Sequence, residues 1–156
     1  MADNLLSEEE SLLRNTVRDY SNDVLATRAA DYDESGLFPW DNFKELGDMG
    51  LLGLGIGEEY GGSGGTTRLV ALAAEEIARG CAATSVVYIA HLSLCTQFIN
   101  RYGSEDQKHK YLPDLASGKK VGAFALTEPG AGSDAAAITT NSVRANGHLV
   151  VNGNKT

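Results

Sequence analysis

The hydrophobic pattern of this 156-residue chain changes once, near Gly118, and that change limits the folds open to it. Before Gly118, apolar residues recur every three or four positions, which is typical of amphipathic helices. After it, apolar runs are short and Asn-Gly pairs follow, which is typical of strands joined by tight turns. The sequence therefore predicts an α+β chain, with an amino-terminal α-helical bundle over residues 1–118. The first part of an antiparallel β domain follows over 119–156.

Two capping boxes mark helix starts in the amino-terminal part. Ser7-Glu8-Glu9-Glu10 can satisfy the free backbone donors of a first turn and predicts a helix over about 8–32. Ser104-Glu105-Asp106-Gln107 has the same form and predicts a short helix near the end of the bundle. Pro113 is expected to interrupt that short helix, because proline lacks the amide donor and clashes with the preceding turn.

Three more helices are expected between these two. Pro39 suits the first turn of a second helix, and a glycine-rich loop over 50–65 follows it. Thr67 can cap a third helix over 67–80, and Thr84 or Ser85 can open a fourth that runs to Tyr102. A helical bundle is the simplest arrangement that buries the apolar faces of these segments.

The carboxyl-terminal part is expected to be β. Val121 to Thr127 is apolar and short enough for a strand. Residues 141–145 and 148–151 are expected to form two strands around the turn signal Asn146-Gly147. A second such signal, Asn152-Gly153, predicts another hairpin turn, and no returning strand follows it before the last residue. The chain is thus expected to be truncated within a β domain; a short disordered tail is the alternative.

Charge and composition argue against several classes of protein. The net charge is −8 and the pI is about 4.8, so no basic stripe is available for nucleic acid. No apolar run reaches the roughly 18 residues of a membrane span, and the first residues resemble neither a signal nor a transit peptide. Cys81 and Cys95 are expected to be buried reduced thiols. No His, Cys and carboxylate grouping has metal-ligand spacing. A soluble, cytoplasmic protein is expected.

The segment Phe124 to Asp134 carries the candidate chemistry. It offers hydroxyls at Thr127 and Ser133, and its glycines let backbone N–H groups approach a ligand, as in a nest for a pyrophosphate. A turn around Pro129-Gly130 that merely ends a strand is an equally good explanation from the residues alone. The pattern is not the G-x-G-x-x-G of a Rossmann unit, because no βαβ arrangement surrounds it.

Several segments resemble the acyl-CoA dehydrogenase family in the same order along the chain. Phe124 to Asp134 resembles the flavin-binding signature of that family, and the likeness covers nearly the whole sequence. It is strongest for the short-chain, butyryl-CoA-like branch, through Ser117-Gly118-Lys119 and Glu128-Pro129-Gly130. The other segments that carry it are Glu58-Glu59-Tyr60-Gly61-Gly62, Glu75-Glu76-Ile77-Ala78-Arg79-Gly80, Tyr102 to Lys108, Tyr111 to Gly118 and Val150 to Lys155.

The resemblance implies a set of FAD contacts in this chain. The residues of this set are Phe124, Leu126, Thr127, Gly132 and Ser133. Leu126 and Thr127 would present backbone and hydroxyl groups to the isoalloxazine ring, and Gly132 and Ser133 would face the pyrophosphate. Ser133 would also lie near the CoA part of the substrate. Glu128 and Asp134 are acid–base candidates by residue type, but fixing the turn is their expected role. The family's proton-abstracting glutamate belongs to a carboxyl-terminal helical domain, and no residue here corresponds to it, so no catalytic residue is assigned.

The resemblance also implies that the fourth helix carries the wall of the acyl cavity. Val87, Ala90 and Leu94 are three and four residues apart and so share a helix face, although core packing explains such a stripe equally well. His91 is expected to be a packing residue, and His109 and His148 are expected at the surface.

The implied activity is α,β-desaturation of an acyl-CoA, as in fatty acid metabolism, with electrons passed from FAD to an electron-transferring flavoprotein. Family members are usually homotetramers. The family's Trp-Ile-Thr flavin contact and the contacts from a partner subunit are absent, so we expect this chain by itself to bind FAD weakly. Because the base is also absent, we expect it to lack dehydrogenase activity. Two alternatives remain open: a flavin-dependent monooxygenase or oxidase of the same fold, and a truncated, non-catalytic binding or assembly module.

Overall fold

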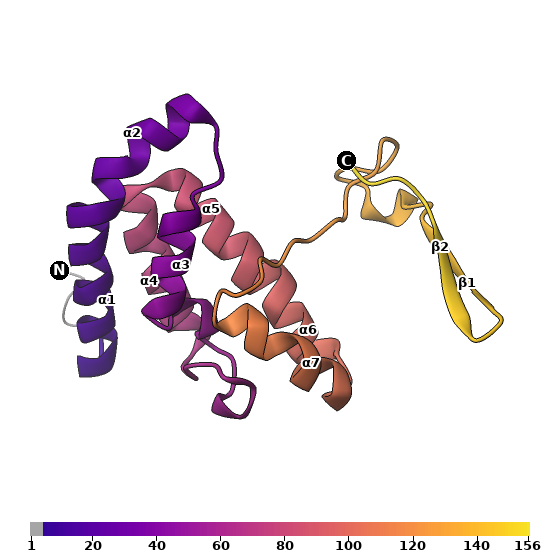
Figure 1. Ribbon diagram of the computed structural model, residues 1–156, viewed down its shortest axis with the longest axis horizontal. Coiled ribbons are helices and arrows are strands. Elements are labelled where there is room, and N and C mark those ends of the chain that lie inside the picture. The colour runs from indigo at the N-terminus through magenta and orange to yellow at the C-terminus, as the bar shows by residue number, and fades with distance from the viewer. Residues whose placement is uncertain (1–4) are drawn as a thin grey trace. The chain divides into compact units, whose positions relative to one another are not determined.

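The computed structural model describes residues 5–156 and divides the chain into two compact units. The helical unit is Met1–Ala123 and the β unit is Phe124–Thr156 (Figure 1). The α+β class, with helices first and an antiparallel pair of strands second, is confirmed. The division follows Ala123 rather than Gly118, because residues 119–123 are bound to the helical unit by hydrogen bonds described below.

The predicted first helix is present, with a wider turn inside it. It consists of α1 (Glu8–Tyr20), a π-helical turn (Ser21–Leu25) and α2 (Ala26–Ser35). The capping box is confirmed: the Glu10 amide donates to Ser7 Oγ over 3.1 Å, and the Ser7 amide donates to Glu10 Oε2 over 2.8 Å. The helix ends at Gly36, whose φ of 64° is in the left-handed region that favours glycine.

The second and third helices bracket the glycine-rich loop. They are α3 (Trp40–Asp48) and α4 (Thr67–Gly80), and the loop contains two short 3₁₀ turns, Leu51–Gly53 and Glu58–Tyr60. The cap of α4 was predicted one residue too late, because Thr66 has the extended backbone of a cap and its side chain accepts the Leu69 amide.

The fourth helix begins earlier than predicted. It consists of α5 (Ala82–Ile89), a second π-helical turn (Ala90–Thr96) and α6 (Gln97–Tyr102). Thr84 and Ser85 are not the first residues of this helix, because it begins at Ala82 and both lie inside it, where they are buried. The cap is Cys81, whose sulfur accepts the Thr84 amide over 3.5 Å. Cys81 is buried as expected, whereas Cys95 is only half-buried.

The last helix of the unit, α7 (Glu105–Ala116), starts at the predicted capping box of Ser104 and Gln107. The prediction that Pro113 interrupts it is wrong. Pro113 lies inside the helix, in its last turn, and the helix nevertheless continues to Ala116 before Gly118 ends it with a φ of 70°.

The core of the helical unit lies where α4 packs between α1 and α5 (Figure 1). Its buried residues come from every helix except α2 and α6, and from the glycine-rich loop; the largest are Tyr88, Phe43, Leu25, Leu46, Leu52, Ile56, Ile77, Leu92 and Leu112. One carboxylate of this unit is also buried: Glu76 of α4 pairs with Arg18 of α1, which joins the two helices, and with Arg79 of its own helix.

The helix over Ala82–Tyr102 is long and apolar enough to cross a membrane by length and composition, contrary to the expectation from the sequence. This test is weak evidence, because the core helix of a soluble protein passes it as well. Several side chains in this helix are fully buried in the helical unit, among them Tyr88, His91, Leu92 and Thr96.

The β unit contains one hairpin. Strands β1 (Asn141–Ala145) and β2 (His148–Asn152) are antiparallel, with Val143 opposite Val150. Asn146 and Gly147 have φ values of 50° and 78°, which is the backbone of a type I′ turn. The first hairpin predicted from the sequence is therefore confirmed.

Two other β predictions are wrong. Val121 to Thr127 is not part of a β-ladder, because no described strand lies beside it. Asn152-Gly153 makes no hairpin turn: Asn152 is still in β2, and Gly153 lacks a positive φ. The chain instead runs back along the earlier segment, where the Thr156 amide donates to the Thr127 carbonyl over 3.0 Å.

Candidate functional site

The candidate segment is built around a tight turn. Glu128 and Ala131 face each other across Pro129 and Gly130, and each donates its amide to the carbonyl of the other over 3.0 Å. Pro129 supplies the fixed φ that such a turn needs at its first corner. The turn explanation of Pro129-Gly130 is thus correct, and a ligand-binding role is compatible with it because the turn leaves its neighbours exposed.

Glu128 organises the β unit from inside. Its carboxylate is buried and accepts the Thr139 and Thr140 amides at 2.8 and 2.9 Å, and Lys155 Nζ lies 3.0 Å from it. Hydrogen bonds from Thr140 and Thr139 hold the pKa of Glu128 far below its ordinary range, and the bond from the Lys155 ammonium adds a smaller effect in the same direction. A carboxylate held in this way stays ionised and is unsuited to proton transfer at neutral pH.

Asp134 also has a structural role. Its Oδ1 accepts the Ala136 amide over 3.2 Å and so caps the 3₁₀ turn Ala135–Ala137. Glu128 thus has the expected structural role, whereas Asp134 caps the 3₁₀ turn that follows rather than the turn at Pro129-Gly130.

The residues expected to contact FAD are all exposed in the β unit: Phe124, Leu126, Thr127, Gly132 and Ser133. A Cβ added at Gly130 or Gly132 would meet no heavy atom within 4 Å, so the backbone there is open to a group from outside the chain. Phe124 and Leu126 are 42% and 45% exposed and offer an apolar surface beside the two hydroxyls. This combination of open backbone, hydroxyls and apolar surface fits a flavin nucleotide.

Lys155 contacts the candidate segment over 124–134, and it is not among the site residues predicted from the sequence. Its ammonium donates to the Leu126 carbonyl over 2.7 Å and also pairs with Glu128. The Thr156 amide likewise donates to the Thr127 carbonyl, so the carbonyl oxygens of Leu126 and Thr127 both accept hydrogen bonds from the end of the chain. No local pattern could have revealed Lys155, because it lies 29 residues from Leu126 in the sequence.

The three residues expected to line the acyl cavity do not share one environment. Val87 is half-buried and packs against the core, Ala90 is half-buried, and Leu94 is 46% exposed. The π-helical turn over Ala90–Thr96 causes this, because its wider winding shifts the residues after it around the helix axis. Their role in a cavity stays a prediction.

A different set of apolar side chains is exposed along the same helix. Val86, Ile89, Phe98 and Tyr102 are between 40% and 67% exposed. Phe98 and Tyr102 also contact each other, with ring centroids 4.9 Å apart. An apolar face of this extent is typical of a binding surface or of an interface with more protein.

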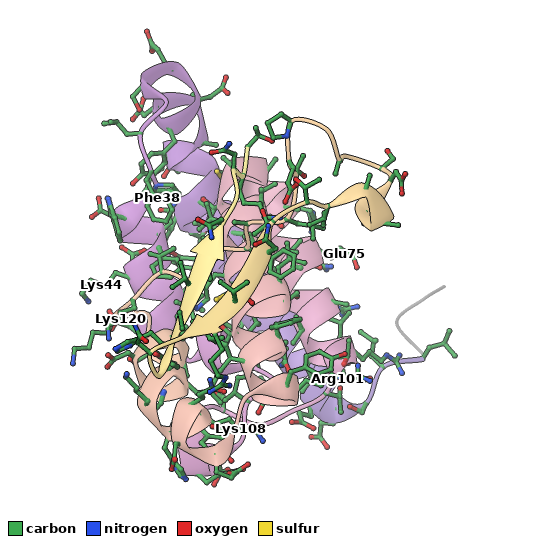
Figure 2. All side chains as sticks on the ribbon, turned by 90° about the vertical axis from the view of Figure 1, so that its right-hand side faces the viewer. Phe38, Lys44, Glu75, Arg101, Lys108 and Lys120 are labelled. Atoms are coloured by element: carbon green, nitrogen blue, oxygen red, sulfur yellow. The ribbon has the colours of Figure 1, made fainter. Side chains whose placement is uncertain are left out.

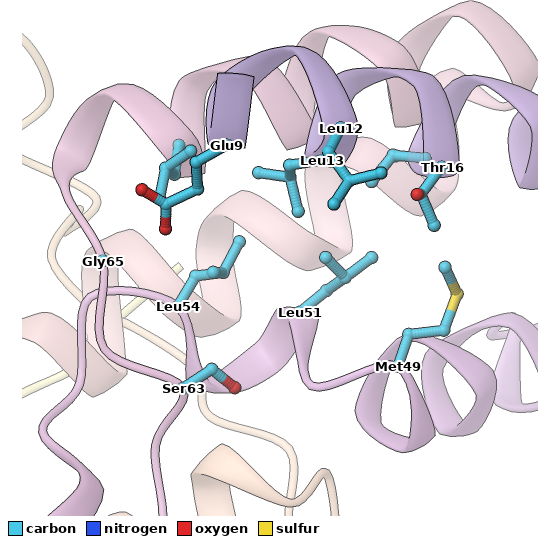
Figure 3. A pocket seen from close by; sticks show the side chains of 11 residues that line it. Glu9, Leu12, Leu13, Thr16, Met49, Leu51, Leu54, Ser63 and Gly65 are labelled. Carbon is cyan, nitrogen blue, oxygen red and sulfur yellow. The ribbon is translucent and has the colours of Figure 1, made fainter. Parts of the chain in front are cut away.

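A separate apolar pocket lies in the helical unit (Figure 3). Its volume is about 300 Å³, and α1 forms one wall while Met49, Leu51 and Leu54 point toward that helix from the opposite side. Glu9 is the one charged side chain among its lining residues. No local sequence pattern predicts this pocket, because its walls come from two separate parts of the chain, residues 9–17 and 49–69.

The family model for the acyl-CoA dehydrogenase amino-terminal domain matches residues 7–119. The chain belongs to the acyl-CoA dehydrogenase family. It is 43% identical over 150 residues to a short-chain specific acyl-CoA dehydrogenase of Clostridium acetobutylicum, which supports the expected branch. It is also 40% identical over 152 residues to an NADH-dependent acryloyl-CoA reductase of Anaerotignum propionicum. Each alignment covers 96% of this chain.

Solved structures show the same fold. A glutaryl-CoA dehydrogenase in complex with glutaryl-CoA is 36% identical with a TM-score of 0.92, and the match covers 97% of this chain and 39% of that one. A glutaryl-CoA dehydrogenase of Mycobacterium smegmatis in complex with FADH2 is 34% identical with a TM-score of 0.91 and the same coverage. A chain from a structure of the electron transferring flavoprotein of Acidaminococcus fermentans is 34% identical with a TM-score of 0.90.

This chain spans about two fifths of the length of the relatives that it matches, namely 40% of the Clostridium protein and 38% of the reductase.

Proposed function

We propose that this chain contributes the amino-terminal helical domain and the first flavin contacts of an FAD-dependent acyl-CoA dehydrogenase. The observation that carries the proposal is the exposed segment over 124–134, whose turn is fixed from behind by Glu128 while Thr127, Gly132 and Ser133 face outward. The similarity to a structure that contains FADH2 supports the choice of cofactor.

In this proposal FAD supplies the redox chemistry, which is acceptance of a hydride from the β-carbon of an acyl-CoA. Leu126 and Thr127 hold the isoalloxazine ring through backbone and hydroxyl groups, and Phe124 covers it. Gly132 and Ser133 hold the pyrophosphate with N–H and hydroxyl donors, and Ser133 also lies near the CoA. The chain's own share is thus binding and orientation.

The proposed product is an α,β-unsaturated acyl-CoA, and the proposed electron acceptor is an electron-transferring flavoprotein, in a homotetrameric and cytoplasmic enzyme of fatty acid metabolism. The similarities to an acyl-CoA complex and to a chain from an electron transferring flavoprotein structure support the substrate class and the partner. The removal of the α-proton requires a base that none of the described residues of this chain supplies, since the best-placed carboxylate, Glu128, is fully engaged.

The proposal is tested by titrating the 156-residue chain with FAD and following backbone amide shifts by NMR. We expect weak binding, with shifts concentrated on residues 124–134. Gly132→Val is expected to abolish these shifts while the fold is kept, because the added side chain enters space that is open within the chain. His148→Gln, an exposed change in β2, serves as the control. Shifts spread evenly over the chain, or unaltered by Gly132→Val, would contradict the proposed site.

A further inference from the structure

Residues 119–123, here called the strap, lie against the helical unit although they form neither helix nor strand. The strap follows α7 and directly precedes Phe124, where the β unit begins; Lys120, within it, is labelled in Figure 2. Gly122 is its buried residue. A Cβ at Gly122 would lie 2.7 Å from the Cys95 sulfur and 3.3 Å from His91 Nδ1. Glycine is therefore required for this close approach.

His91 joins the strap to the end of α7 through both ring nitrogens. The Gly122 amide lies 2.8 Å from Nδ1, and the Leu115 carbonyl lies 3.1 Å from Nε2. A backbone amide can only donate and a carbonyl can only accept, so Nδ1 carries no hydrogen and Nε2 carries one. The partners thus fix both the neutral charge and the tautomer of His91.

The site around His91 is buried and packed. Its side chain is fully buried, and its ring meets Phe43 of α3 edge to face, with centroids 5.0 Å apart. Burial lowers the pKa of His91, and the bond to the Leu115 carbonyl opposes this effect more weakly. The ring therefore resists protonation in the closed arrangement.

The other titratable groups near the strap are Cys95, which stays neutral, and Asp114, Lys119 and Lys120, which form ion pairs. Burial raises the pKa of the Cys95 thiol, with the Ala123 backbone opposing, so this group stays neutral beside His91. Asp114 of α7 pairs with Lys119 and Lys120 of the strap over 3.4 and 2.6 Å. In the described part of the chain, the hydrogen bonds of the His91 ring go to backbone groups and none goes to a carboxylate.

We propose that His91 is a proton-sensitive clamp, which holds the strap while neutral and releases it when protonated. A proton on Nδ1 would place two donors, Nδ1–H and the Gly122 N–H, face to face in a fully buried site, so the bond to Gly122 must break. Protonation therefore favours the released strap, in which His91 reaches water.

The direction of the pH effect follows from the two states. The released imidazole has an ordinary pKa near 6.5, whereas the pKa in the closed state is lower. As the pH falls below 6.5, the ratio of released to closed strap rises about tenfold per pH unit, until the pKa of the closed state is reached. Release lengthens the free chain before Phe124. The clamp does not depend on flavin, so it goes beyond the proposed function and stands or falls separately from it.

Two NMR measurements on the 156-residue chain test the clamp. Long-range nitrogen–proton correlation of the imidazole identifies the tautomer, and hydrogen exchange, corrected for its intrinsic pH dependence, gives the protection of the Gly122 amide. We expect Nε2–H at about pH 7.5, and protection that falls about tenfold per unit below pH 6.5. A Nδ1–H tautomer, a His91 pKa at or above 6.5, or protection that is constant while His91 takes up a proton would each overturn the proposal.

Variants separate the clamp from general acid unfolding. His91→Asn retains an acceptor for the Gly122 amide but has no proton to gain, so the pH dependence of Gly122 protection should disappear. His109→Gln and His148→Gln change the two exposed histidines and should leave that dependence intact. If His91→Asn keeps the wild-type pH dependence, or if either control removes it, the assignment to His91 is wrong. The wild-type titration decides the question even if His91→Asn fails to fold.

Discussion

The two units of this chain are stabilised in opposite ways. The helical unit buries a continuous set of apolar side chains that extends from Val17 to Leu112. In the β unit both strands are exposed along their whole length, and the buried residues are Glu128 and Ala131. Val143, Leu149 and Val151 each remain more than half exposed. One unit is thus stabilised by burial of apolar surface, and the other by hydrogen bonds to a single carboxylate.

This contrast places the candidate chemistry in the less stable unit. A two-stranded hairpin is marginal by itself, and a unit of this size buries little apolar surface. Its backbone nevertheless has a defined turn, because Glu128 collects donors from two segments that are distant in sequence. The backbone at Gly130 and Gly132 is accessible from outside the chain, although the turn that contains it is well defined. A cofactor site requires both properties.

The largest effect is expected from the core of the helical unit. Leu52 is fully buried, and Leu52→Ala should lower the free energy of unfolding of that unit by about 3 kcal/mol, because it removes apolar contacts and leaves a cavity. Denaturant titration followed by the fluorescence of Trp40, the only tryptophan, measures this loss. Trp40 reports on packing there because its ring contacts Phe38 and Phe43.

Leu12→Ala is the matched control, since Leu12 is 69% exposed. It should change the stability by less than about 0.5 kcal/mol. The amide shifts of residues 141–152 should be unaltered in both variants as long as the helical unit is folded. Loss of hairpin order in Leu52→Ala at a lower denaturant concentration than in the wild type, while Trp40 still reports a folded helical unit, would break the contrast between the two units.

We expect Glu128 to be as important for the order of the β unit as Leu52 is for the stability of the helical unit. Glu128→Gln replaces a charged acceptor with an amide whose NH₂ group faces the donors of Thr139 and Thr140, so the dispersed amide shifts of the β unit should be lost. The Trp40 transition of the helical unit should be unaffected. Glu75→Gln, an exposed change in the helical unit (Figure 2), is the control.

The same carboxylate sets an acid limit on the β unit. Because the folded pKa of Glu128 is far below 4.5, the unfolded state binds the proton first as the pH falls below that value. The stability that Glu128 contributes is therefore fully present above about pH 4.5 and is lost progressively below it. Amide shifts of the β unit, followed from neutral pH downward, should show this loss. A β unit whose order is independent of pH in the acid range would contradict the role of Glu128.

Sequence patterns predicted local structure well where the cause is local. Both capping boxes and the Asn146-Gly147 turn depend on residues within four positions of each other, and all three are confirmed. The candidate segment was also found from its own residues. What the sequence could not supply was the pairing of Lys155 with Glu128, which joins residues 27 positions apart.

The two wrong β predictions share one physical reason, which is that long-range contacts override local preference. Val121 to Thr127 is apolar, but part of it is held by His91 rather than by a neighbouring strand. Asn152-Gly153 suits a turn, but Lys155 and Thr156 draw the chain back along residues 126–128. The π-helical turn over Ala90–Thr96, which separates Val87 from Leu94, leaves no signal in the hydrophobic spacing.

The smallest expected effect tests how far the β unit depends on its turn. Gly147 has a φ of 78°, where an alanine is strained by roughly 1 kcal/mol. Gly147→Ala should therefore increase the exchange of the amides in β1 and β2 several-fold. Gly130→Ala is the control, because a Cβ there meets nothing within 4 Å and the φ is not positive. If Gly147→Ala disrupts the turn at Glu128 as well, the hairpin and the carboxylate form one cooperative unit. If only the hairpin responds, Glu128 alone fixes the candidate flavin segment.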